Sequence, residues 1–377
     1  MTPRALASAL CGPVAAALLL LGSPAPAPAA PTAPVGVFAY YYIWFDASSW
    51  SRAKTDFPLL GRYSSDERIV MRRHVRWAKQ AGLSGFIVSW KSTPTLDRRL
   101  ARLVAIASTS RFKLAVIYQG LDFERRPLPA SRIADDLRKF VYRYRTNPVF
   151  HTFGGKPLVI WSGSWKFTRA QIMRVRRAIG DSIYLLASER NADDYLRVAD
   201  LFDGDAYYWS SVNPRTYPDY PKKLVALGAA VHTGGGLWIA PAAPGFDARL
   251  IGGQTVVGRG DGNTFRREFE GALASSPDAV GVISWNEFSE NSQIEPSTRY
   301  RNRYLSLLAS VLGGHAPVVM GFSSDDRPAT GTEYGLPLIA VFVLVVAGAM
   351  VAVFRRGRHP DSGGANGGSD DSGGSRT

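Results

Sequence analysis

Glu287 and Glu290 lie three positions apart in residues 283–297, ISWNEFSENSQIEPS, directly after a run of apolar residues. Two carboxyl groups held close together in a pocket with little water repel each other when ionised, so one keeps its proton near neutral pH. One protonated carboxyl group and one carboxylate are the groups that cleave a glycosidic bond. We therefore predict that Glu287 and Glu290 form a catalytic pair.

This prediction depends on a turn. Side chains alternate along a strand, so residues three apart point to opposite sides while the chain stays extended. The composition NEFSEN favours a turn after Trp285, which would bring both carboxylates to one side. Alternatively, Glu287 caps a helix or pairs with an arginine, and Glu290 and Glu295 are surface charges in a loop. The spacing alone leaves both interpretations open.

Eight apolar segments must position this pair. Strands are predicted at residues 36–44, 85–90, 113–119, 157–163, 182–189, 203–210, 236–242 and 279–285. The intervening segments repeat apolar residues every three or four positions, which is typical of amphipathic helices. Eight strand–helix pairs with nearly continuous apolar strands favour a single (β/α)8 TIM barrel, an α/β fold. A doubly wound open sheet is the alternative, but the first strand lacks the glycine-rich turn expected there.

Aromatic residues dominate the carboxyl ends of these strands, where a barrel holds its chemistry. Aromatic rings stack on the apolar faces of sugars, and polar groups between the rings bind the hydroxyl groups. The sequence thus predicts a polysaccharide or glycan as the partner. The strand ends carry Tyr42, Trp44, Trp90, Tyr118, Gln119, Trp161, Glu189, Tyr208, Trp209, Trp285 and Glu287.

The two ends of the chain predict a membrane-anchored protein. Residues 1–30 have the charge, apolar core and small-residue site of a signal peptide, and they contain the only cysteine, Cys11. Residues 336–354 are uncharged and long enough to cross a bilayer as a helix. The arginines that follow predict a cytoplasmic C-terminus and an extracellular domain at 31–321. Residues 322–335 are interpreted as a stalk and 355–377 as a disordered tail.

The formal net charge of +14 does not indicate nucleic-acid binding. Many arginines fall on the expected outer faces of helices, as in residues 66–82, and such faces are solvated. The five histidines show no metal-ligand spacing, and the mature chain would contain no cysteine. We therefore predict no metal, no cofactor and no nucleic-acid partner.

The segment SWNEFSENSQIEP, residues 284–296, resembles the W-N-E-[WF]-x-E-x-x-Q-I-E-P motif of glycoside hydrolase family 99, the endo-α-mannosidase-like hydrolases. Similar likenesses occur in AYYYIWF at 39–45, FDGDAYYW at 202–209 and APAAPGFDARLI at 240–251. The resemblance extends from residue 39 to residue 296. It implies a barrel that cleaves α-linked mannose or a related sugar with retention of configuration.

The resemblance also assigns roles. Glu287 corresponds to the base that acts on the 2-hydroxyl of the substrate, and Glu290 to the general acid; the intermediate is a 1,2-anhydro sugar. Tyr208 corresponds to a tyrosine near the first carboxylate, and Trp44 and Trp90 to aromatics beside the cleft. The full set of predicted substrate-binding residues is Tyr42, Trp44, Trp90, Gln119, Tyr208, Trp285, Asn286, Gln293 and Glu295.

Some positions depart from the family pattern. Ile43 replaces a proline, Lys91 a tryptophan, Gln119 a carboxylate, Ser289 a histidine and Asn291 a glycine. These changes leave the sugar and its linkage open, as well as endo or exo action. Two alternatives remain: a non-catalytic glycan-binding surface protein on the same barrel, and an α-glucan-cleaving hydrolase.

Overall fold

The computed structural model describes residues 35–319 apart from residues 53 and 123. The predicted signal peptide, stalk, membrane helix and tail lie outside these residues. Within the described residues, no helix has both the length and the hydrophobicity needed to span a bilayer.

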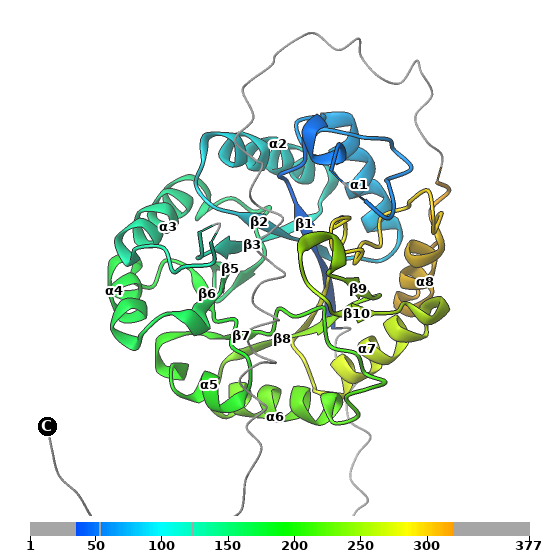
Figure 1. Cartoon of the computed structure of the whole chain (residues 1–377). Helices are drawn as coiled ribbons and strands as arrows, with labels where there is room; N and C mark the ends of the chain where they lie inside the picture. Colours follow the sequence, from blue (N-terminus) through cyan, green and yellow to red (C-terminus); the bar gives the residue numbers. More distant parts are fainter. Residues whose placement is uncertain (1–34, 53, 123, 320–377) are drawn as a thin grey trace, which may run out of the picture. The chain divides into compact units, whose positions relative to one another are not determined.

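Eight parallel strands form a barrel in the described part of the chain (Figure 1). Neighbours around the ring run from β7 through β8, β11, β1, β2, β3 and β5 to β6. A parallel bridge between Ala187 and Asp205 closes the ring between β6 and β7. The strands are β1 (Gly36–Tyr42), β2 (Gly85–Trp90), β3 (Lys113–Gln119), β5 (Lys156–Ser162), β6 (Tyr184–Leu186), β7 (Gly204–Ala206), β8 (Leu237–Ala242) and β11 (Ala279–Val282).

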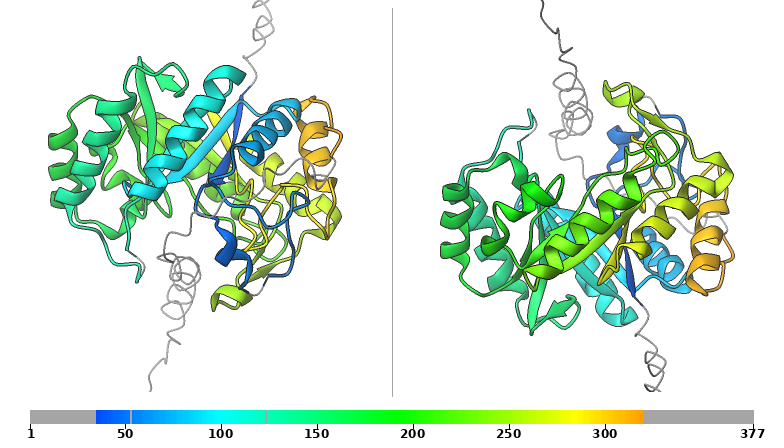
Figure 2. Two further views of the ribbon diagram at one scale, coloured as in Figure 1. Left: turned by 90° about the horizontal axis from the view of Figure 1, so that it is seen from above. Right: turned by 90° about the horizontal axis from the view of Figure 1, so that it is seen from below.

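Helices surround these strands, which lie at the centre of the barrel (Figures 1 and 2). Each predicted helix is present, although the fifth is shorter than its apolar pattern suggested and continues as a 3-10 turn at Ala199–Leu201. The helices are α1 (Arg68–Gln80), α2 (Pro94–Ser110), α3 (Ala130–Tyr144), α4 (Arg169–Ile179), α5 (Ala192–Leu196), α6 (Tyr220–Thr233), α7 (Asn263–Ala274) and α8 (Arg303–Leu312).

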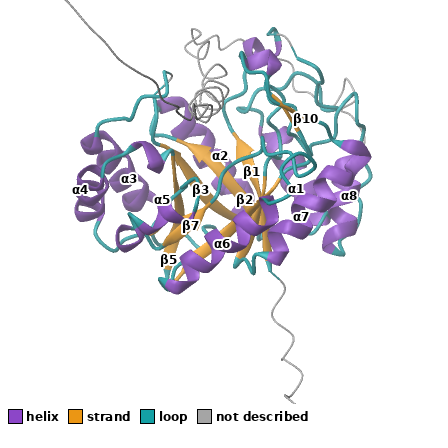
Figure 3. Cartoon of the chain, turned by 60° about the horizontal axis from the view of Figure 1, so that its bottom comes forward, coloured by secondary structure: helices purple, strands orange, loops and turns teal. Residues whose placement is uncertain are grey.

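Short strands add to the barrel at two places. β4 (Thr152–Phe153) pairs antiparallel with the start of β5. β9 (Phe246–Asp247) and β10 (Val256–Val257) pair with each other in the long connection between β8 and α7. Figure 3 shows β10 among the loops beyond one end of the barrel strands.

The barrel strands are buried on both faces, as their continuous apolar sequences predicted. All six residues of β2 and of β8 are buried. Along β1, Tyr41 stacks on Phe86 and contacts His74 of α1, whereas Tyr40 contacts Tyr208. Successive side chains of β1 therefore alternate between the helix layer and the barrel interior.

β6 and β7 are shorter than predicted. The sequence pattern suggested strands at residues 182–189 and 203–210, but hydrogen-bonded strand ends at Leu186 and Ala206. Tyr208 and Trp209 consequently lie in the connection after β7. The apolar and aromatic residues continue past the last hydrogen-bonded pair of each strand, so the sequence pattern could not show where the strand ends.

Candidate active site

The chain turns back after the last barrel strand, as predicted. The N–H of Ser284 donates to the carbonyl of Ser292 (2.9 Å), and the N–H of Ile294 donates to the carbonyl of Ser284 (2.9 Å). Within this closed loop, the Ser284 hydroxyl accepts a hydrogen bond from the Glu287 N–H (2.8 Å). The loop brings Glu287 and Glu290 close enough for their charges to interact.

Glu287 is buried, with 4% of its surface exposed. Its Oε1 accepts a hydrogen bond from the Ser289 N–H (2.9 Å). Burial raises the pKa of Glu287 to about 7, although this hydrogen bond and the positive charge of Lys54 oppose the rise. A carboxylate with a pKa near neutrality is suited to act as a general base.

Glu290 is equally buried, with 4% of its surface exposed. Burial raises its pKa well above the ordinary value, the charge of Glu287 adds to the rise, and Arg125 opposes it. Burial and the charge of Glu287 thus favour the protonated form of Glu290, whereas Glu287 has a hydrogen bond and a nearby cation that favour its ionised form. Such a pair supplies one base and one acid.

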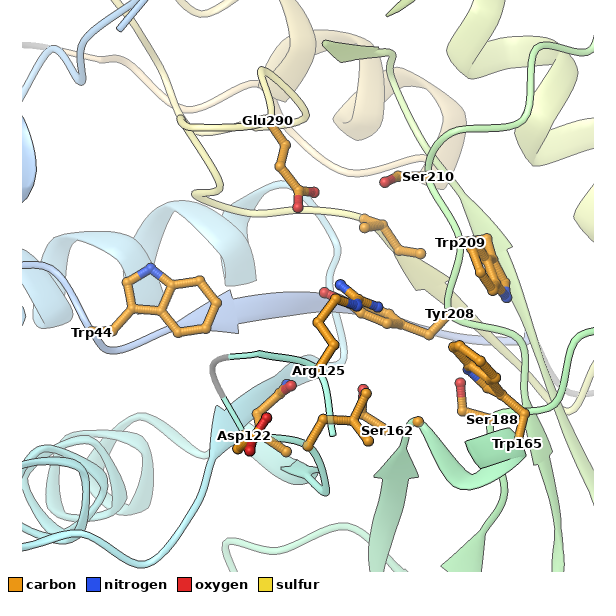
Figure 4. A pocket seen from close by; sticks show the side chains of 14 residues that line it. Trp44, Asp122, Arg125, Ser162, Trp165, Ser188, Tyr208, Trp209, Ser210 and Glu290 are labelled. Carbon is orange, nitrogen blue, oxygen red and sulfur yellow. The ribbon is translucent and has the colours of Figure 1, made fainter. Parts of the chain in front are cut away.

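A pocket at the carboxyl ends of the strands lies beside Glu290 (Figure 4). It is bounded by the connections that follow β1, β3, β5, β6, β7 and β11. Active sites of barrel enzymes occupy this end of the fold. The lining residues are Trp44, Gln119, Leu121, Asp122, Arg125, Ser162, Gly163, Trp165, Ser188, Tyr208, Trp209, Ser210, Ile283 and Glu290.

Tyr42 lies directly behind this lining. It is the last residue of β1, and its hydroxyl group hydrogen-bonds to the hydroxyl of Tyr208, which lines the pocket. Burial raises the pKa of both phenols, and the charge of Glu290 contributes in each case. Both phenols are therefore neutral at physiological pH and can donate or accept hydrogen bonds.

Four of the eleven predicted site residues line the pocket: Trp44, Gln119, Tyr208 and Glu290. Tyr42 and Glu287 lie next to the pocket: Tyr42 hydrogen-bonds to Tyr208, and the charge of Glu287 acts on Glu290. The remaining five, Trp90, Trp285, Asn286, Gln293 and Glu295, are outside the lining.

Trp90 and Trp285 pack in the layer between the strands and the helices. Trp90 contacts Tyr118 and Phe140, and its indole N–H donates to Asp97 of α2 (2.9 Å). Trp285 contacts His74 and Phe86. Trp90 ends β2, where the alternation of the strand turns it toward the helices, whereas Trp285 lies in the turn after β11.

Asn286, Gln293 and Glu295 support the loop from behind. Asn286 bonds the backbone of Tyr42, and Gln293 donates to Asp56 (2.9 Å). The carboxylate of Glu295 contacts His74 Nε2 at 3.0 Å and accepts from the Tyr63 hydroxyl at 2.8 Å. All three side chains are at most 2% exposed. Their contacts position the loop. A sequence motif alone cannot distinguish a residue that supports the loop from one that contacts the substrate.

The sequence reasoning missed Arg125, Asp122 and Trp165, and it placed Trp209 at the rim without a role. Trp165 and Trp209 form one side of the pocket, with ring centroids 6.4 Å apart (Figure 4). Trp165 lies only three residues after the end of β5, so the rule that strand ends hold the site could have identified it. Arg125 lies in the polar loop DFERRP, which has the composition of ordinary surface.

The positions that depart from the family pattern have ordinary local partners. Lys91 Nζ donates to the Leu121 carbonyl (2.9 Å), and the carbonyl of the fully buried Ile43 accepts from Arg99 (3.0 Å). Gln119 donates to Ser89 (3.0 Å) and Asn291 to the Tyr300 hydroxyl (3.4 Å). Ser289 supplies the N–H that binds Glu287. Of these, Gln119 alone lines the pocket.

Among the described residues, no group of three or more histidine, cysteine, aspartate or glutamate side chains is arranged to hold a metal ion.

Comparisons with known proteins point to one family. The sequence model of glycosyl hydrolase family 99 matches residues 51–309, which is more than half of the chain. The glycoprotein endo-alpha-1,2-mannosidase of Mus musculus is 24% identical over 268 residues, 65% of this chain and 57% of the relative. A glycoprotein endo-alpha-1,2-mannosidase-like protein of Danio rerio is 24% identical over 268 residues, 64% and 59% of the two chains. The chain thus spans less than two thirds of the length of these curated relatives.

A solved structure shares the fold. The GH99 endo-alpha-mannosidase of Bacteroides thetaiotaomicron superimposes with a TM-score of 0.65 at 19% identity, covering 74% of this chain and 96% of that chain. The superposition shows that the two chains share the barrel fold, and at this identity it shows the fold alone. Roles for individual side chains have to come from the geometry of the pocket.

Proposed function

The chain belongs to glycosyl hydrolase family 99, and from that premise we propose that it is a retaining hydrolase of α-linked mannose, or a related sugar, in a glycan or polysaccharide. The relatives described as endo-alpha-1,2-mannosidases support the choice of sugar. Glu287 and Glu290 are the proposed catalytic pair.

The observation that carries this proposal is the unequal environment of the two carboxyl groups. Glu290 lines the pocket and holds its proton more tightly, whereas Glu287 is stabilised as an anion by the Ser289 N–H and Lys54. This difference supports Glu290 as the acid and Glu287 as the base. The assignment agrees with the one that the family motif implies.

In the first step, Glu287 takes the proton from the 2-hydroxyl of the sugar. The 2-oxygen attacks the anomeric carbon, the glycosidic bond breaks, and Glu290 gives its proton to the departing oxygen. The product on the enzyme is a 1,2-anhydro sugar. No bond forms between the sugar and the protein.

In the second step, Glu290, now ionised, removes a proton from water. The water oxygen attacks the anomeric carbon and opens the three-membered ring, and the 2-oxygen recovers a proton from Glu287. Two inversions at one carbon give net retention of configuration. Both carboxyl groups end in their starting protonation states.

The pocket walls suit a sugar substrate. Trp44, Trp165 and Trp209 supply aromatic surface, and Gln119, Ser162 and Tyr208 supply hydrogen-bonding groups between them. Aromatic faces and polar groups in alternation are the usual means of binding a pyranose.

We also propose that the protein acts at the cell surface, with the barrel outside and the C-terminal tail in the cytoplasm. The support comes from the sequence of residues 1–30 and 336–354 and from the arginines that follow. Added protease should digest the barrel on intact cells but leave a tag at the C-terminus intact. A tag that is digested while the barrel survives would contradict this orientation.

The test of function uses the full chain, in detergent, with α-mannan and α-glucan oligosaccharides. Products are followed by mass, and their anomeric form by NMR. The proposal predicts release of an α-configured product from an α-mannoside, and its loss in Glu290→Gln. Glu270→Gln, an exposed change of the same kind on α7, is the matched control.

Other outcomes would contradict the proposal in different ways. A product of inverted configuration would exclude the two-step mechanism. Cleavage of α-glucans alone would replace mannose as the substrate. Binding of the oligosaccharides without cleavage would favour a glycan-binding protein on the same barrel.

A further inference from the structure

Arg125 places a positive charge in the pocket that the proposed chemistry does not require. Its side chain extends from the loop after β3 into the lining shared with Glu290 (Figure 4). Within the described residues, no side chain or backbone atom forms a hydrogen bond or ion pair with its guanidinium, and its Nε is buried without a partner. A partly buried, unpaired cation is costly unless a ligand supplies the opposite charge.

The acids of the pocket lining do not neutralise Arg125. Asp122 is held by Arg126, whose Nε donates to Oδ2 at 2.8 Å and whose backbone N–H donates to Oδ1 at 2.7 Å. Glu290 also lines the pocket but forms no ion pair with Arg125, and burial and the charge of Glu287 raise its pKa, which favours its neutral form. Among the described residues, Arg125 therefore presents a guanidinium to the pocket that no carboxylate pairs with.

The local backbone fixes Arg125 in this place. Its φ of 61° lies in the left-handed region, and its N–H closes a turn onto the Asp122 carbonyl (3.1 Å). Its carbonyl accepts a hydrogen bond from Lys166 Nζ (2.9 Å), and that ammonium lies 5.3 Å from the ring of Trp165. A second cation thus lies beside the backbone of Arg125, and Arg125 and Trp165 line the same pocket.

We propose that the pocket takes a glycan carrying an anionic substituent (phosphate, sulfate or carboxylate), and that Arg125 binds that group while the aromatic wall binds the sugar ring. A guanidinium suits all three because its planar N–H groups match two oxygens of an oxyanion. This inference rests on the proposed function, since it specifies the substrate class of the same pocket.

The experiment measures direct binding, so it does not depend on cleavage. Mannose 6-phosphate, methyl α-D-glucuronoside and neutral methyl α-D-mannoside are titrated into the full chain at pH 7. Wild type is compared with Arg125→Gln. Arg138→Gln is the control, because it removes the same charge from the exposed surface of α3. The phosphate and carboxylate arms distinguish the two kinds of anion.

We expect wild type to bind at least one anionic sugar about tenfold or more tightly than the neutral one. Arg125→Gln should reduce that preference to about twofold or less, and Arg138→Gln should retain it. Equal binding of anionic and neutral sugars by wild type would overturn the inference. So would a preference that survives in Arg125→Gln, or an absence of binding by every anionic probe.

The two proposals can fail separately. A protein that prefers anionic sugars through Arg125 but cleaves no α-mannoside would contradict the hydrolase function alone. A protein that cleaves neutral α-mannosides and shows no preference for anions would contradict the role of Arg125 alone.

Discussion

Asn286 holds the backbone of Tyr42 by two hydrogen bonds. Its Oδ1 accepts from the Tyr42 N–H at 2.8 Å, and its Nδ2 donates to the Tyr42 carbonyl at 2.9 Å. Asn286 directly precedes Glu287, and Tyr42 ends β1. This contact therefore ties the catalytic loop to the first barrel strand.

Asn286→Ala should lower the free energy of unfolding by about 2–4 kcal/mol, because two buried backbone groups lose their partners. Urea denaturation of the full chain measures this change. Asn302→Ala is the control, since Asn302 is exposed and its side chain makes no cap hydrogen bond to α8. Equal unfolding free energies for the two variants would show that the contact contributes little.

Glu295→Ala tests whether Glu295 supports the loop or binds substrate. Removing one partner from its buried contacts with His74 and Tyr63 should cost about 3 kcal/mol of stability. The KM of the correctly folded fraction should remain within about twofold, because both carboxylate oxygens of Glu295 are held by His74 and Tyr63. A large rise in KM with unchanged stability would instead indicate contact with the sugar.

The activity should depend on pH through Glu287. The base must be ionised, so kcat/KM should rise with pH through about 7, the pKa of Glu287. It should fall again at higher pH as Glu290 loses the proton that it donates.

Lys54→Gln tests whether Glu287 is the group whose ionisation causes the rise of kcat/KM with pH. Lys54 lowers the pKa of Glu287, so its removal should move that limb to higher pH. Arg138→Gln, with the same change in charge, should leave it in place. A rising limb that does not respond to Lys54→Gln would assign the base to another group.

Glu290→Gln should make the protein more stable at neutral pH. The raised pKa means that the folded state binds the Glu290 proton more tightly than the unfolded state, so above the unfolded pKa the ionisation of Glu290 in the unfolded chain favours unfolding. The gain should be small near pH 4.5 and about 1–3 kcal/mol above pH 7. Thermal unfolding at both pH values measures it, with Glu270→Gln showing no pH-dependent gain.

The sequence predicted the barrel well because nearly continuous apolar strands alternate with helices whose apolar residues recur every three or four positions. It also predicted the turn that joins Glu287 and Glu290, since the composition of NEFSEN opposes an extended chain. It could not separate Tyr42, whose hydroxyl lies beside the pocket, from Trp285, which packs against His74. Both are aromatic residues at the end of an apolar run, but Tyr42 ends a strand and Trp285 lies in the turn after one, which the run itself does not reveal.

Arg125 shows another limit of sequence reasoning. Its neighbour Arg126 is an exposed partner of Asp122 and Glu124, and the two arginines are indistinguishable by composition. The left-handed backbone at Arg125 directs one of them into the pocket. Such a turn depends on the hydrogen bonds of the folded loop.

The role of Glu290 as acid is tested most directly by leaving-group dependence. An α-linked mannobiose tests a leaving group that needs protonation, and an α-mannosyl fluoride tests one that does not. Fluoride release is measured in the first turnover. Glu290→Gln should cleave the mannobiose about 100-fold or more slowly than wild type. Its rate of fluoride release should stay within about tenfold of wild type. Equal losses on both substrates, or near wild-type cleavage of the mannobiose, would contradict the assignment of Glu290 as the acid.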